Sequence, residues 1–201
     1  MSTHRDSLRR DGLHHDARAV LAGWTAPTPE EERLRREFLA HLDAHDDAMW
    51  RECAPGHLTA TTAVLSHDGG EVLLTLHPKA GMWLPMGGHC EATDASLALA
   101  ALREATEESG IAGLTLLDGP LALDRHRVWC HPPHSWHLDV EYGAVAPPGA
   151  EAMISDESLD LRWFPVDEIP ELSDEATRRL ARRARDLLVA RAGRGTGTGT
   201  A

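Results

Sequence analysis

Apolar residues at the start of the chain recur at helical spacing. Within residues 34–49 they keep roughly to one face of a helix: Leu34, Phe38, Leu42 and Met49. Just before them, Thr28, Pro29 and Glu31 form a capping-box pattern with proline at the first helical position. We therefore predict a helical N-terminal extension over residues 1–56, whose helix serves packing or dimerisation rather than chemistry.

From Leu58 onward the apolar runs become short and rich in leucine and β-branched residues. The runs 58–66 and 71–77 are joined by His-Asp-Gly-Gly, a strong hairpin signal, and predict a tight pair of strands. The next run, 82–91, contains Pro85 and the Gly87–Gly88 pair, which predict a strand that gives way to a loop.

An alanine-rich helix follows, for which Thr93 or Asp94 is the predicted N-cap and Gly110 the left-handed residue at the C-terminal end. Four later runs have strand character: 114–119, 121–129, 136–146 and 159–164. Ser173 is predicted to cap a last helix with leucines along one side. Its five arginines are interpreted as a solvated face. The order of elements predicts a mixed α/β fold with helices on a sheet.

Composition limits the classes of function. With 201 residues, of which 42% are hydrophobic, the chain is long enough for one core domain with extensions. A net charge of -12 disfavours nucleic acids and anionic membranes as partners, and suggests that a cation mediates any contact with phosphates. Three cysteines, an odd number without the spacing of paired thiols, favour a cytoplasmic protein, and the absence of a long apolar run disfavours a membrane segment.

The densest chemical signal is the sequence ALREATEESGI at 101–111, where Arg103 precedes three glutamates. At about 100° per residue, Glu104, Glu107 and Glu108 share one sector of a helix and repel one another. Either nearby arginines and solvent neutralise an ordinary surface cluster, or a hard divalent cation binds there.

The stretch 87–111, GGHCEATDASLALAALREATEESGI, resembles the Nudix box. The matching positions are Gly88, Arg103, Glu104, Glu107, Glu108, Gly110 and Ile111. Two departures occur in the first half of the motif: Asp94 replaces the expected glutamate, and one extra residue precedes Arg103. The resemblance implies an α/β/α sandwich with a mixed sheet at 57–192, preceded by the helical extension and followed by a tail at 193–201, whose Gly-Thr repeat predicts disorder.

The same resemblance implies a hydrolase that cleaves the phosphoanhydride bond of a nucleoside diphosphate joined to another group, with Mg²⁺ or Mn²⁺. By that resemblance, Glu104, Glu107, Glu108 and the carbonyl of Gly87 bind the metal. Glu104 also orients or deprotonates the attacking water, and Arg103 holds a glutamate in place. A non-catalytic nucleotide-binding or regulatory module of the same fold is the alternative, and a related isomerase is disfavoured by its divergent motif.

Two further segments are candidates for the site. Nudix enzymes often take another base or ligand from a loop after the box, and Glu157 in the acidic run 155–160 is our choice. The run CHPPHSWH at 130–137 has three interpretations: a zinc site, a flexible polar loop or a substrate contact, of which the loop is favoured. For substrate contact, His137 and Asp139 are the predicted residues, whereas a nucleophilic role for Cys90 is disfavoured.

Overall fold

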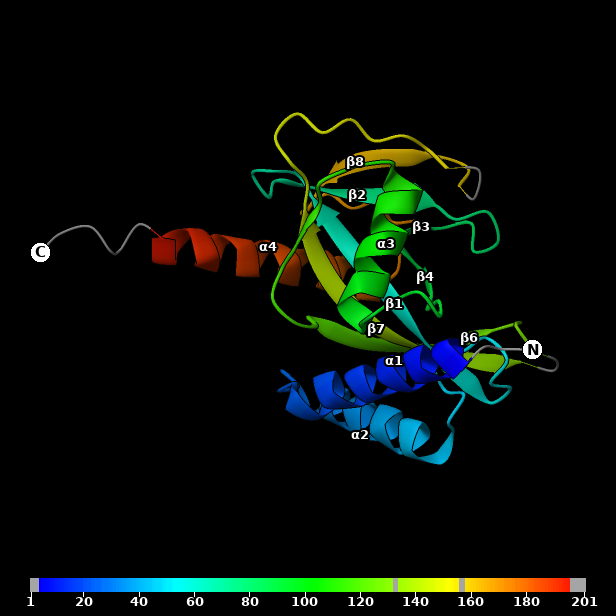
Figure 1. Ribbon diagram of the computed structural model, residues 1–201. Coiled ribbons are helices and arrows are strands. Elements are labelled where there is room, and N and C mark those ends of the chain that lie inside the picture. Colours follow the sequence, from blue (N-terminus) through cyan, green and yellow to red (C-terminus); the bar gives the residue numbers. More distant parts are fainter. Residues whose placement is uncertain (1–3, 132–133, 156–157, 196–201) are drawn as a thin grey trace, which may run out of the picture.

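A single mixed sheet with helices on both sides forms the protein (Figure 1). The computed structural model describes residues 4–131, 134–155 and 158–195. The helices are α1 (His4–Gly23), α2 (Pro29–Ala44), α3 (Leu97–Ser109) and α4 (Glu175–Gly195). The strands are β1 (Gly56–Leu65), β2 (Glu71–Leu76), β3 (Trp83–Leu84), β4 (Met86–His89), β5 (Thr115–Leu116), β6 (Ala122–Val128), β7 (Ser135–Val145) and β8 (Leu161–Pro165).

Strand β1 is the centre of this sheet. It pairs in parallel with β7 along its whole length and antiparallel with β2 and β4. Strands β5 and β6 pair with β7, and β3 and β8 pair with β2. The predicted α/β class and the predicted hairpin of β1 and β2 are therefore confirmed.

Alternate residues of β1 contact different helices, because successive side chains of a strand point to opposite faces of the sheet. Thr62 donates its hydroxyl to the carbonyl oxygen of Ala101 in α3, at 3.1 Å. Its neighbours Ala63 and Leu65 belong to the cluster that α4 completes with Leu180. The sheet is thus buried on both sides, with α3 and α4 on opposite faces (Figure 1).

The glycine pair does not begin a loop, as the sequence predicted, but lies within β4. Gly87 pairs with Thr61 of β1, and Gly88 pairs with Ala60. A Cβ atom on Gly87 would lie 2.4 Å from Oγ1 of Thr61 and 2.8 Å from the carbonyl oxygen of Ala60. Glycine is needed here because the two strands approach more closely than a side chain allows.

The N-cap of α3 differs from both predicted residues. The Ser96 side chain accepts a hydrogen bond from the amide of Leu99, so Ser96 is the cap. Asp94 instead accepts from the amide of Glu91 at 2.8 Å and closes the turn before the helix. At the other end, Gly110 has φ 66°, which confirms the predicted left-handed residue.

At the start of α4, Asp174 takes the place predicted for Ser173. Its Oδ1 accepts from the amide of Thr177 at 2.7 Å, whereas the hydroxyl of Ser173 is buried without a hydrogen-bond partner in the described part of the chain. The helix continues to Gly195, three residues into the segment 193–201 predicted to be disordered. The rest of that segment lies outside the described residues, and the predicted domain boundaries stay predictions.

The N-terminal helices share a core with the sheet. As predicted, Thr28 caps α2, accepting from the amide of Glu31. The cluster that contains Phe38 of α2 also includes residues of α1, α3 and β7. Glu31, near the start of α2, forms an ion pair with Arg183 of α4. Arg179, also in α4, pairs with the buried Glu141 at 3.2 Å. Two arginines of α4 thus bind the body of the protein rather than forming only a solvated face.

No helix in the described residues is long and apolar enough to cross a membrane. The predicted cytoplasmic location and homodimer stay predictions.

Helix α1 also contacts the first turn of α3. Oδ2 of Asp16 accepts a hydrogen bond from the amide of Leu97, at 2.8 Å, and this amide is one of those that a helix cannot satisfy internally. Asp16→Ala should therefore lower the free energy of unfolding by about 1 kcal/mol, measured by chemical denaturation. Asp11→Ala, which removes an exposed carboxylate from the same helix, is the control. Equal losses in both variants would show that the hydrogen bond from Leu97 to Asp16 contributes nothing to stability.

Candidate active site

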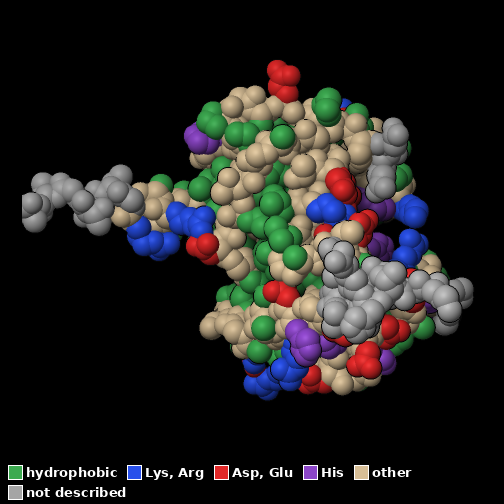
Figure 2. Space-filling view, viewed as in Figure 1, with side chains coloured by type: hydrophobic (Ala, Val, Ile, Leu, Met, Phe, Trp, Pro, Cys, Tyr) green, Lys and Arg blue, Asp and Glu red, His purple; other side chains and the backbone are tan. Residues whose placement is uncertain are grey.

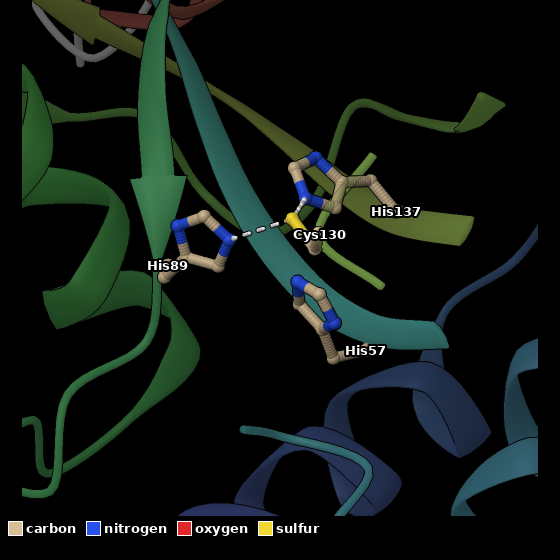
Figure 3. Close-up of side chains that lie close together, drawn as sticks. All are labelled: His57, His89, Cys130 and His137. Atoms are coloured by element: carbon tan, nitrogen blue, oxygen red, sulfur yellow. Dashed lines mark hydrogen bonds between the residues drawn. The ribbon is translucent and has the colours of Figure 1, made fainter. Parts of the chain in front are cut away.

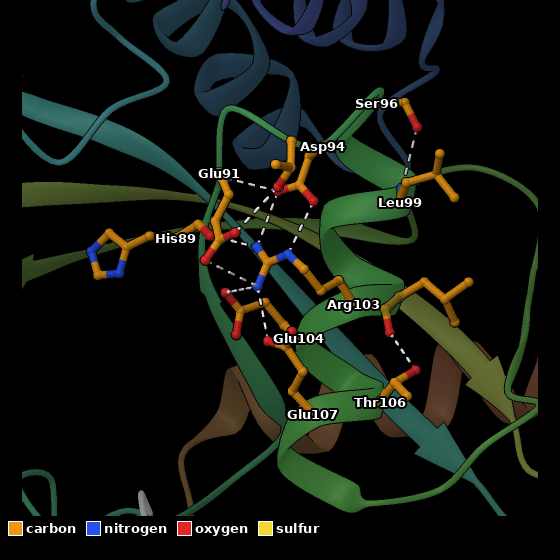
Figure 4. A network of polar contacts seen from close by, with 11 residues as sticks. His89, Glu91, Asp94, Ser96, Leu99, Arg103, Glu104, Thr106 and Glu107 are labelled. Atoms are coloured by element: carbon orange, nitrogen blue, oxygen red, sulfur yellow. Dashed lines mark hydrogen bonds and ion pairs between the residues drawn. The ribbon is translucent and has the colours of Figure 1, made fainter. Parts of the chain in front are cut away.

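Arg103 is the centre of a polar network on α3 (Figure 4). Its Nε and one terminal nitrogen donate to the two carboxylate oxygens of Asp94, each at 3.0 Å. That terminal nitrogen also donates to the carbonyl oxygen of His89 in β4, at 2.9 Å. The hydrogen bonds with Asp94 are the largest cause that raises the pKa of Arg103 above its ordinary value. Paired bonds of this kind fix the position of the guanidinium.

The remaining terminal nitrogen of Arg103 serves two glutamates of α3. It donates to Oε1 of Glu104 at 3.1 Å and to Oε2 of Glu107 at 3.0 Å. The Glu104 side chain is only 15% exposed, while that of Glu107 is 61% exposed. Asp94 and the more distant Glu91, at 4.0 Å, also pair with Arg103, so one positive charge is divided among four carboxylates, and Glu108 follows on the same helix.

Glu104 is confined on its other side by the backbone of β4. A Cβ atom on Gly88 would lie 2.7 Å from the carboxylate carbon and Oε1 of Glu104. The absence of a side chain at Gly88 therefore leaves the space that this carboxylate occupies. The carbonyl oxygen of Gly87, one residue earlier, stays a predicted metal ligand.

The apolar part of α3 explains why these acids lie where they do. Leu97, Ala100, Ala101 and Ala105 are fully buried against the sheet. On the face seen in Figure 2, acidic, basic and histidine side chains gather beside this region. Burial of one side of α3 holds the glutamates at a fixed place on the protein, although they repel one another. Clustered carboxylate oxygens fit a hard divalent cation such as Mg²⁺ or Mn²⁺.

The other predicted site residues lie elsewhere. Asp139 is buried in β7 and accepts a hydrogen bond from the hydroxyl of Thr59, at 2.9 Å, while burial raises its pKa. His137 lies two residues earlier on the same strand, among other histidines. Their predicted substrate contact stays a prediction, and Glu157 lies outside the described residues. Burial raises the pKa of Cys90 to about 12, which agrees with its disfavoured role as a nucleophile.

Sequence reasoning missed two groups of residues that the structure brings together. The first is Asp94, which the sequence marked only as a departure from the motif and as a candidate cap. In the structure its carboxylate accepts hydrogen bonds from Arg103. Its spacing from Arg103 offered a signal, since an acid is expected near that position of the motif. Ring contacts join His57, His89 and His137, which come from three different strands. No local pattern in the sequence indicates that these three histidines meet.

Comparison with known proteins places this geometry in context. The family model of the NUDIX domain matches residues 56–186. A hydrolase of the NUDIX family from Clostridium perfringens is 28% identical, with a TM-score of 0.52 over 66% of this chain and 97% of that one. No match is found among curated proteins.

Two more distant structures share the fold alone. The Ap4A hydrolase of C. elegans, solved as a binary complex, is 18% identical, with a TM-score of 0.53 over 66% of this chain and 98% of that one. The dihydroneopterin triphosphate pyrophosphohydrolase of E. coli is 15% identical, with a TM-score of 0.52 over 63% of this chain and 92% of that one.

Proposed function

The chain belongs to the Nudix family, whose members hydrolyse phosphoanhydride bonds, and from this premise we propose that it is a divalent-metal-dependent pyrophosphohydrolase. Its proposed substrate is a nucleoside diphosphate joined to another group. The observation that carries the proposal is the arrangement of α3, where Arg103 is shared among Asp94, Glu104 and Glu107. A helix with more clustered acids than its arginine neutralises supports the binding of a cation.

The proposed metal ligands are Glu104, Glu107, Glu108 and the carbonyl oxygen of Gly87. When bound, Mg²⁺ or Mn²⁺ supplies positive charge to the phosphate oxygens and lowers the pKa of a bound water. Glu104 is our candidate for orienting or deprotonating the attacking water, because Arg103 and the backbone at Gly88 restrict its position.

A second carboxylate from the later loop, Glu157, remains our proposal for a further base or ligand. The described chain on its N-terminal side passes the end of α3, where the amide of Met153 donates to the carbonyl oxygen of Ser109 at 2.8 Å. On its C-terminal side, Ser158 and Thr75 of β2 share a hydroxyl hydrogen bond. The loop is therefore anchored to α3 and to the sheet on either side of this acid.

A panel of substrates tests the proposal. ADP-ribose, a dinucleoside polyphosphate, an oxidised nucleoside triphosphate and a capped RNA are each incubated with the protein and Mg²⁺ or Mn²⁺. Phosphate is then measured with and without added phosphatase or inorganic pyrophosphatase. We expect turnover of at least one small nucleotide, with phosphate appearing only after the second enzyme is added, and complete loss in EDTA. Turnover that survives EDTA, or no turnover of any compound, would contradict the proposal.

A further inference from the structure

Four side chains of metal-ligand type meet outside the carboxylate site (Figure 3). They are His57 of β1, His89 at the end of β4, Cys130 after β6 and His137 of β7, and one ligand atom from each lies within 4.8 Å of all the others. The sulfur of Cys130 is 3.6 Å from Nε2 of His137 and 4.0 Å from Nε2 of His89. These side chains point toward one another.

The pairing of strands explains this meeting. His57 lies opposite His137 in the parallel pair of β1 and β7. Thr59, two residues after His57 and on the same face of β1, lies opposite His89 of β4. Cys130 lies two residues after the end of β6, the antiparallel neighbour of β7. Residues separated by up to 80 positions along the chain are thus brought together by the sheet register.

The environment of His57 indicates that its ring nitrogens are available to bind a further group. Both of its ring nitrogens are buried, and neither makes a hydrogen bond of good geometry within the described residues, although the backbone of Cys53 lies close to the ring. Buried polar atoms in native proteins are nearly always satisfied, since leaving one unpaired costs free energy. A buried imidazole nitrogen without such a partner can instead offer its lone pair to a metal ion.

We propose that His57, His89, Cys130 and His137 bind one zinc ion in a structural site. Zn–S and Zn–N bonds of about 2.3 and 2.0–2.1 Å place the atoms of a tetrahedral site roughly 3.3–3.6 Å apart. The observed distances from the Cys130 sulfur approach that range. Three imidazoles and one thiolate select zinc over Mg²⁺ or Mn²⁺, which prefer oxygen. With four protein ligands the site is closed, which is typical of structural rather than catalytic zinc.

This site joins the carboxylate network through one residue. The ring of His89 points into the histidine cluster, while its carbonyl oxygen accepts from Arg103 (Figures 3 and 4). Zinc would therefore fix the end of β4 next to Gly88. The metal assignment itself depends only on the four ligands, and it stands or fails independently of the proposed hydrolysis.

Cobalt substitution tests the site through its sulfur ligand. Full-length protein, freed of metal with a chelator, is titrated with Co²⁺ and followed by absorption spectroscopy. We expect a thiolate-to-cobalt charge-transfer band and intense visible bands of tetrahedral cobalt, saturating at one equivalent and disappearing when zinc is added. Carboxylates cannot produce the thiolate band, so metal bound at α3 does not interfere.

Three variants complete the test. Cys130→Ser should lose the charge-transfer band, and His137→Ala should weaken zinc binding at least about 10-fold in competition with a chromophoric chelator. His131→Ala is the matched control, because His131 adjoins Cys130 but binds the carbonyl oxygen of Arg51 and is not one of the four clustered side chains. It should behave as the unsubstituted protein does. The absence of a thiolate band in the unsubstituted protein, which needs no variant to fold, would overturn the proposal, as would equal zinc affinity in all four proteins.

Discussion

Glu108→Gln should lower the metal-dependent turnover of the best substrate by about 10²–10³-fold, without a loss of stability. The substitution removes one negative charge from the proposed metal ligands but keeps nearly the same shape. Because Glu104 and Glu108 are one helical turn apart, their repulsion is also relieved, by a few tenths of a kcal/mol in the absence of metal. The expected loss is therefore in turnover rather than in folding, which distinguishes a metal site from an ordinary structural acid.

The measurements are kcat/KM at several Mg²⁺ concentrations and the Tm in EDTA. Glu107→Gln should also lose turnover, and Glu168→Gln, at an exposed position in the turn after β8, serves as the control. We expect Glu168→Gln to keep the kcat/KM and the Tm of the unsubstituted protein. If Glu107→Gln and Glu108→Gln retain full turnover, α3 is not the metal-binding helix.

Local features of the site could be predicted from the sequence because their causes are local. The spacing of Glu104, Glu107 and Glu108 on one turn of a helix follows from helical geometry alone. Gly110 ends α3 as its position suggested, since a left-handed residue there favours glycine. Pattern and structure agree on these points because no distant contact competes with them.

The errors arose where a distant partner decides the outcome. The glycine pair was interpreted as the start of a loop, yet β1 passes so close that only glycine fits in the strand. Thr93 or Asp94 was predicted to cap α3, but Asp94 binds Arg103, and Ser96 caps the helix instead. Likewise, His57 and His89 lie far in sequence from Cys130, so the segment 130–137 alone could not indicate a four-ligand site. Sheet register is a property of the whole chain, and it is not visible in a short motif.

Gly88→Ala should lower kcat/KM by about 10²-fold while changing stability little, because its new Cβ atom would meet the Glu104 carboxylate at 2.7 Å. The atoms in the way are the far end of a flexible side chain, so the carboxylate can move aside without distorting the sheet. That movement displaces Glu104 from the place where Arg103 holds it. The loss should appear in kcat/KM, and the Tm should remain near that of the unsubstituted protein.

Gly87→Ala provides a matched comparison, since it makes the same chemical change one residue earlier. Its Cβ atom would meet the backbone of β1, 2.8 Å from the carbonyl oxygen of Ala60 and from Cα of Thr61, and neither atom can move without shifting the strand. We expect a loss of about 1–3 kcal/mol in the free energy of unfolding. The two adjacent substitutions should thus have different effects: Gly88→Ala should lower turnover, and Gly87→Ala should lower stability. Full activity in Gly88→Ala would show that the position of Glu104 is not critical, and would remove it as the candidate for orienting water.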